Sequence, residues 1–200
     1  MRFTRWLLTF LLFFLSQPSR AALTSSFDAQ VGFLGANISA GQTFNGYLET
    51  LNLIQTNYTL HFTGPNLSLN LSFLEVPSSN LGLMPLTRLG MGLRWYFLGH
   101  NGARVIYDNA VSGNLWTPTP FIGLELGLSN LTINSESTFF DAASVDMKLD
   151  FGIEVPMDAD WILLGQLGFL ANVSSFGAES VSSQVSYSAL YVQCGFRVIH

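Results

Sequence analysis

The stretch AASVDMKLDFGIEVP, residues 142–156, decides the fold because its apolar and polar residues alternate without a break. Apolar side chains take the odd positions from Val145 to Val155, while Asp146, Lys148, Asp150 and Glu154 stand between them. Side chains of a strand point alternately to opposite faces, so this strand has one apolar face and one charged face. A soluble sheet buries its apolar face, whereas a transmembrane barrel turns that face to lipid and keeps the charges inside.

The first 21 residues predict a secretory signal peptide. Arg2 and Arg5 precede an apolar run from Trp6 to Leu15, and a polar break follows with the small-residue site Ser19-Arg20-Ala21. The run is shorter than the roughly 20 apolar residues that a membrane-spanning helix needs. We therefore expect cleavage after Ala21, which leaves one domain over residues 22–200.

The charge balance beyond the predicted cleavage site excludes several classes of protein. Only five basic residues lie there, against all thirteen acidic ones, so nucleic acid is not an expected partner. Charged residues make up 10% of the sequence, well below the roughly 25% of an ordinary soluble domain. Cys194 is the single cysteine, so an internal disulfide is excluded.

Alternating segments recur along the rest of the chain, and helical periodicity is almost absent. Residues of the turn type separate these segments, as expected for an antiparallel meander. In the second segment the phase shifts between Leu53 and Ile54, which predicts a β-bulge at that point. Segments of about ten residues are long enough to cross a bilayer when tilted. The predicted strands cover about residues 27–33, 47–62, 67–73, 86–97, 120–130, 142–156, 161–173 and 187–199.

The charges on the polar faces of these strands are nearly balanced, which favours a closed interior. A water-facing surface needs no such balance, whereas an unpaired buried charge costs several kcal/mol. The predicted lumen charge network has five acids and four bases: Asp28, Arg88, Arg94, Glu125, Asp146, Lys148, Asp150, Glu154 and Arg197.

Glycines and aromatic residues add to the argument for a membrane barrel. Glycines accompany the charges on the polar faces, where a narrow interior must fit small residues beside long ones. Aromatic residues gather near the strand ends closest to the chain termini, as in the girdle at a membrane interface. Phe27 and Phe62 belong to this set. The main predicted interface aromatics are Trp95, Phe97, Trp116, Phe121, Trp161 and Phe196.

Two motifs resemble a known class of proteins. GMGLRWYF at residues 90–97, followed by WTPTPFIGLELGLS at 116–129, looks like the central hairpin of small bacterial outer-membrane β-barrels, the broad class of the OmpA, OmpX and OmpW barrels. The resemblance implies an all-β fold, an eight-stranded antiparallel up-and-down transmembrane β-barrel. It also implies the outer membrane of a Gram-negative bacterium as location, with outer-membrane lipid and the outer-membrane assembly machinery as partners.

The chain departs from the pattern of this class at two places. Such barrels usually end in phenylalanine, which the assembly machinery reads, whereas this chain ends Phe196-Arg197-Val198-Ile199-His200. The connection over residues 98–119 is longer than the short periplasmic turn of the class.

No residue pattern predicts a catalytic or metal site. His61, His100 and His200 are far apart in the sequence, and none has a partner at metal-ligand spacing. We therefore expect no enzymatic activity, no cofactor and no metal. Because an eight-stranded barrel is just wide enough to be filled by side chains, an open pore is not expected either. Inside it, Arg94 and Glu125 are expected to form an ion pair.

The sequence then assigns the function to the loops at the far end of the barrel. These cover about residues 37–46, 77–85, 130–142 and 174–185, and they fit a structural or surface-interaction role with an unidentified loop partner. One alternative is an OmpW-like passage of small apolar molecules through a lateral opening. Another is a secreted soluble β-barrel or sandwich that binds a ligand.

Overall fold

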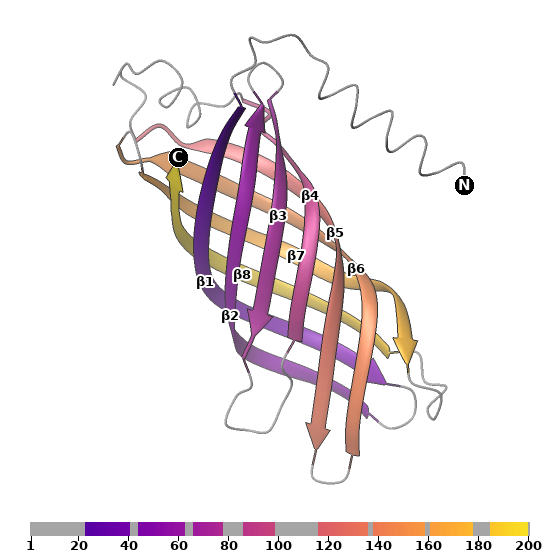
Figure 1. Cartoon of the computed structure of the whole chain (residues 1–200). Coiled ribbons are helices and arrows are strands. Elements are labelled where there is room, and N and C mark those ends of the chain that lie inside the picture. The colour runs from indigo at the N-terminus through magenta and orange to yellow at the C-terminus, as the bar shows by residue number, and fades with distance from the viewer. Residues whose placement is uncertain are drawn as a thin grey trace, which may run out of the picture.

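Eight antiparallel strands close into a barrel, as Figure 1 shows. The structure is a computed structural model that describes residues 23–40, 44–62, 66–77, 86–98, 116–135, 138–158, 161–177 and 185–199. The strands are β1 (Leu23–Ala40), β2 (Phe44–Phe62), β3 (Leu67–Val76), β4 (Leu86–Trp95), β5 (Thr119–Ser135), β6 (Thr138–Pro156), β7 (Trp161–Gly177) and β8 (Val185–Ile199). Each strand pairs with its neighbours in sequence, and β8 pairs with β1, so the predicted up-and-down barrel is confirmed.

The barrel has two ends. β1 begins and β8 ends at the first one, which we call the terminal end. The connections β1–β2, β3–β4, β5–β6 and β7–β8 lie at the other, which we call the loop end. The predicted signal peptide and most of the 98–119 connection lie outside the described residues.

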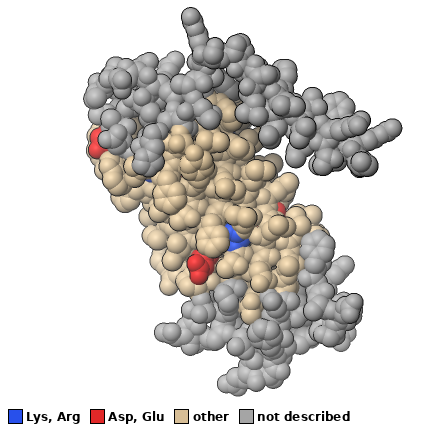
Figure 2. Space-filling view, in the orientation of Figure 1, with Lys and Arg blue, Asp and Glu red and all other residues tan. Residues whose placement is uncertain are grey.

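Alternation along each strand sorts the side chains between the lumen and the outer surface. On β6, Met147 is 40% exposed on the outside, while its neighbour Lys148 is fully buried inside. Large apolar residues such as Val31, Leu126 and Val192 are likewise exposed on the outer wall. On the face seen in Figure 2, only scattered coloured atoms of charged residues interrupt the uncharged surface.

The strands extend further toward the loop end than the sequence predicted. β1 continues to Ala40 and β2 begins at Phe44, so most of the predicted loop at 37–46 is strand. Most of the predicted loop at 130–142, and part of that at 174–185, also belongs to strands; residues 78–85 lie outside the described part. These strand ends are rich in serine and asparagine, so the backbone pairing continues without the alternation of apolar and polar residues that marks the middle of the strands.

The predicted bulge between Leu53 and Ile54 is wrong in its position. Both residues follow a continuous register with β1, where Leu53 pairs with Gly32 and Ile54 with Val31. The irregularity lies closer to the loop end, where Leu34 pairs with Leu51 and Ala36 with Leu48. Leu53 points into the lumen in regular strand geometry, and its apolar side chain only appeared to break the phase.

Two backbone hydrogen bonds at the terminal end extend the pairing beyond the strands. The Tyr96 amide donates to the Asn66 carbonyl at 2.8 Å, and the Trp116 amide donates to the Pro156 carbonyl at 2.7 Å. Trp116 adopts a φ of 64°, a left-handed conformation that bulky residues seldom take. Within the described residues, no helix is long and apolar enough to cross a membrane.

Candidate functional site

The barrel interior is the candidate site because it gathers the ionisable side chains. All nine charged residues assigned to the lumen network are at most 1% exposed. They arrive there from five strands, β1, β4, β5, β6 and β8, because each occupies an inward position of the alternation. They form two clusters at different heights.

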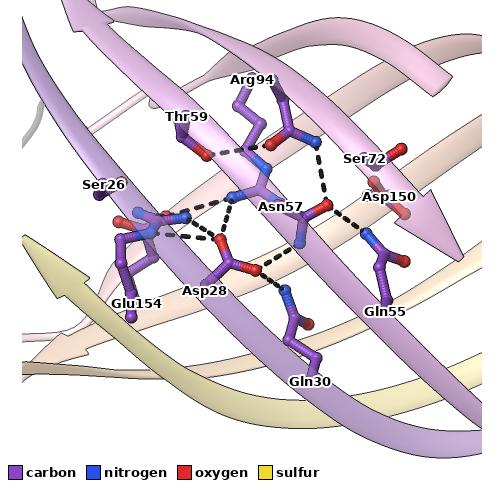
Figure 3. A network of polar contacts seen from close by, with 12 residues as sticks. Ser26, Asp28, Gln30, Gln55, Asn57, Thr59, Ser72, Arg94, Asp150 and Glu154 are labelled. Carbon is purple, nitrogen blue, oxygen red and sulfur yellow. Dashed lines mark hydrogen bonds and ion pairs between the residues drawn. The ribbon is translucent and has the colours of Figure 1, made fainter. Parts of the chain in front are cut away.

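The terminal cluster consists of Asp28, Glu154, Arg94 and Arg197, two acids and two bases. Arg197 donates to the Glu154 carboxylate at 2.6 Å and lies 3.3 Å from Asp28 Oδ2. Arg94 Nη1 lies 3.7 Å from Asp28 Oδ2 and 4.0 Å from Glu154 Oε1. Figure 3 shows Asp28 at the centre of these contacts, where it also accepts hydrogen bonds from Gln30 and Asn57. The cluster is electrically neutral.

The middle cluster consists of Arg88, Glu125, Asp146, Lys148 and Asp150. Arg88 donates to Asp146 at 2.6 Å and to Glu125 at 3.0 Å. Lys148 Nζ lies 3.5 Å from Glu125 and 3.3 Å from Asp150, so it joins the two acids. Glu125 therefore meets two bases of different strands, which makes it the most highly connected carboxylate of this cluster.

The expected ion pair between Arg94 and Glu125 is wrong. In the β4–β5 register Arg94 lies opposite Gly123, whereas Glu125 lies opposite Gly92, one inward position closer to the loop end. Glu125 therefore pairs with Arg88 and Lys148 of the middle cluster. Arg94 reaches the acids of the terminal cluster instead, and its guanidinium lies 4.9 Å from the centre of the Phe121 ring.

The predicted place of Phe121 among the interface aromatics is also wrong. It is only 1% exposed and packs inside the barrel against the Tyr96 ring, with the two ring centres 5.7 Å apart. Its odd position puts it in phase with Gly123 and Glu125, on the inward face of β5. Gly152 lies opposite it on β6 and leaves the space that the ring fills.

The other predicted interface aromatics lie on the outer wall near the terminal end. Trp116 is 62% exposed, and Trp95 contacts Phe97 with ring centres 6.0 Å apart. Trp161 and Phe196 meet edge to face at 6.4 Å. The structure thus places five of the six residues on one rim of the barrel.

The loop end of the lumen is apolar, which the sequence reasoning missed. Thirteen buried residues form this loop-end apolar cluster, in which Leu34, Ala36 and Ile38 of β1 meet residues of the seven other strands. Tyr187 connects this cluster to the middle cluster, because its hydroxyl donates to Asp146 at 3.0 Å. The remaining members are Leu53, Leu74, Val76, Leu86, Leu131, Ala142, Leu170, Ala189 and Tyr191.

Uncharged polar residues of the lumen were also missed as site residues. Asn70 and Ser72 donate to the two oxygens of Glu125, and Gln55 accepts from Lys148 and Gln193. Their inward positions on β2, β3 and β8 were the signal that could have found them. With these neighbours, Glu125 and Lys148 are held by hydrogen bonds as well as by ion pairs.

The arrangement offers structural support and no ready metal site. Among the described residues, no group of three or more His, Cys, Asp or Glu side chains is placed to hold a metal ion. That the chain is no enzyme stays a prediction of the sequence.

Comparison with known proteins supports the fold. No family model matches the sequence, and no curated protein matches it. Neisserial surface protein A is similar in structure, with a TM-score of 0.53 at 11% sequence identity, covering 86% of this chain and 96% of that one. The outer membrane protease OmpT from Escherichia coli is similar with a TM-score of 0.52 at 6% identity, covering 92% and 99%. At these identities the likeness shows a shared β-barrel fold and carries no activity across.

Proposed function

We propose, from this outer-membrane type of barrel fold, that the chain is an integral outer-membrane protein with a closed lumen. In this role its loop-end hairpins serve a structural or surface-interaction function. The observation that supports it is the inverted polarity of the wall, with charges buried inside and large apolar residues exposed outside. A soluble barrel with this surface would expose a large apolar area to water, which favours aggregation.

Two layers of different chemistry close the lumen in this proposal. The terminal and middle clusters fill one part with ion pairs and hydrogen bonds, and the loop-end apolar cluster fills the other. An ion entering from the loop end would have to leave water for an apolar layer before it reached the charges, which is costly. The barrel is therefore expected to conduct no ions.

Conductance of the reconstituted barrel tests this closed state. Purified protein inserted into a planar lipid bilayer should give no steady ion current above that of the bare bilayer. Steady single-channel currents would contradict the proposal. A variant with Leu34→Gly and Leu170→Gly removes two large members of the apolar layer and tells whether the charged layer alone stops ions.

Passage of small apolar molecules is the second candidate function, and the apolar cluster is the observation that favours it. Leu74, Val76 and Leu86 of this cluster lie on β3 and β4, which have only 10 residues each. The neighbouring strands β2 and β5 have 19 and 17 residues, so among the described residues the strand pairing is shortest beside the apolar cluster. Uptake of a small apolar dye into vesicles that contain the protein, compared with empty vesicles, separates this function from a structural role.

The chemistry of the loop partner is limited by charge. Every basic residue beyond position 21 except Arg104 lies in the lumen. The predicted loops at the loop end therefore contain acidic residues and no basic ones. A polyanionic partner would meet no counter-charge there. We therefore propose a neutral or cationic partner. Binding of fluorescent polylysine, but not of heparin, to the reconstituted protein would support this proposal.

A further inference from the structure

We propose that a groove on the outer wall, where β1 meets β8, binds one acyl chain of a lipid from the leaflet on the loop side. This inference rests on the proposed membrane location and adds a defined lipid site to it.

The groove has a volume of about 440 Å³ and lies between outward side chains of three strands. Val31 and Phe33 of β1 border it, together with Ile54 of β2 and Val192 and Cys194 of β8. Gly32, Leu53 and Gln193 also line it. Because Leu53 and Gln193 have buried side chains in the lumen, they meet the groove with their backbone and form its floor.

A sharp turn of the barrel wall explains why a groove opens here. A Cβ atom on Gly32 would lie 2.1 Å from the Val192 carbonyl oxygen, and one on Gly195 would lie 2.0 Å from the Ala29 carbonyl oxygen. The inner faces of β1 and β8 therefore approach each other so closely that only glycine fits. On the convex outer side of such a turn, the side chains of the two strands diverge and leave a gap between them.

The chemistry of the lining indicates what fills this gap. Val31, Phe33, Ile54 and Val192 present hydrocarbon only, and they are continuous with the exposed apolar surface of the neighbouring strands. In a bilayer, the molecules in contact with this surface are lipid chains. Burying methylene groups against apolar atoms is favourable and needs no polar contact.

Asn52 gives the groove its orientation. It is exposed on the outer wall, lies opposite Phe33 in the β1–β2 register, and borders the groove on the loop-end side. Its amide offers a donor and an acceptor at the point where an acyl chain reaches its ester group. No basic residue is exposed on the described outer wall, so the site recognises the chain and its ester rather than a phosphate.

A similar turn at β4–β5 supplies a matched control. A Cβ on Gly92 would lie 2.1 Å from the Leu124 carbonyl oxygen, so the wall turns sharply there too. Its outward residues Met91, Leu93 and Leu126 have longer side chains than Val31, Val192 and Cys194, so they cover more of the turn. Changes at Leu126 should therefore leave lipid binding at β1–β8 intact.

Native mass spectrometry tests the proposal on the whole barrel. Protein is transferred from phosphatidylethanolamine vesicles into mild detergent, and the bound lipid is counted. The unsubstituted protein should carry one lipid, and Cys194→Trp should reduce that fraction roughly tenfold, the loss expected when about two methylene groups leave the groove. Leu126→Trp should match the unsubstituted protein.

Three results would overturn the lipid site. These are an unsubstituted protein without retained lipid, equal retention by Cys194→Trp, and a two-chain mass that Cys194→Trp abolishes, which would assign the groove to a second copy.

Should Cys194→Trp fail to fold, the unsubstituted protein in nanodiscs still tests the lipid site. The methyl groups of Val31, Ile54 and Val192 should then show stronger nuclear Overhauser effects to lipid chain protons than those of Leu126, and equal effects contradict the site. A heat-modifiable, inserted barrel without retained lipid refutes only this inference, whereas a protein that does not insert refutes the proposed function.

Discussion

Met147 and Lys148 are neighbours in sequence and occupy opposite environments. Met147 is exposed on the outer wall, while Lys148 contacts Glu125 and Asp150 in the lumen. In a Cys194→Ser background, Met147→Cys in membranes should react rapidly with a lipid-soluble maleimide, and Lys148→Cys should stay unmodified. Mass spectrometry of the labelled protein measures both. Equal labelling of the two positions would mean that the strand does not separate lipid from lumen.

Among single residues, we expect substitution of Glu125 to cause the largest loss of stability. It accepts from Arg88 at 3.0 Å and lies 3.5 Å from Lys148, and all three side chains are buried. Glu125→Ala leaves both bases with less negative charge around them, so the free energy of unfolding should fall by about 3 to 5 kcal/mol. Urea titration of the protein in lipid vesicles, followed by tryptophan fluorescence, measures this loss.

Two controls make the Glu125 result specific. Glu75→Ala removes an exposed acid of β3 and should change stability by less than about 0.5 kcal/mol. Arg88→Met combined with Glu125→Leu should lose less stability than the sum of the two single changes, because either single change already breaks the Arg88–Glu125 ion pair. Simple additivity would show that the two side chains do not interact.

The sequence could predict which residues lie inside but not which of them touch. Strict alternation predicted the inward faces of β4, β5 and β6. It also indicates that Phe121 faces inward, because Phe121 is in phase with Glu125, but its place at a strand end suggested the interface instead. The partners of Arg94 depend on the register and on the reach of long side chains across the lumen. Neither can be read from one strand alone.

At the scale of strands, Gly152 and Phe121 form a complementary pair between β6 and β5. A Cβ on Gly152 would lie 2.2 Å from the Phe121 ring, so Gly152→Ala forces the buried ring to move. We expect a loss of about 1 to 3 kcal/mol in the free energy of unfolding. The loss should be clearly smaller in a Phe121→Leu background, which a double-mutant cycle in urea measures.

Gly165 of β7 is the matched control for this change. A Cβ there meets only the Ile153 side chain, at an ordinary distance of 3.7 Å. Gly165→Ala should therefore leave the stability nearly unchanged. If Gly152→Ala is equally harmless, the ring does not fill the space opposite Gly152.

The strand ends show where pattern recognition fails at this scale. Alternation marks a strand only where its two faces meet different surroundings, and it fades where β1, β2, β5 and β6 continue toward the loop end. Leu53 produced the opposite error, because an apolar residue that faces an apolar part of the lumen looks like a change of phase. The loop-end apolar cluster, assembled from all eight strands, leaves no signal in any single segment.

At the scale of the whole molecule, the fold follows from a single repeated choice of polarity. The outward positions of the strands hold large apolar residues, while the lumen buries the nine network charges together with the loop-end apolar cluster. Closure of β8 onto β1 leaves no strand edge unpaired at the barrel seam. The same choice makes a lipid bilayer the environment in which this surface is stable.

Membrane extraction combined with heat modifiability tests this central claim most directly. The protein should stay in the membrane pellet after a urea wash, enter solution only with detergent, and migrate at different positions on a gel before and after boiling, because a closed barrel resists unfolding by detergent until it is heated. A protein that is soluble without detergent and migrates identically with and without boiling would contradict the account.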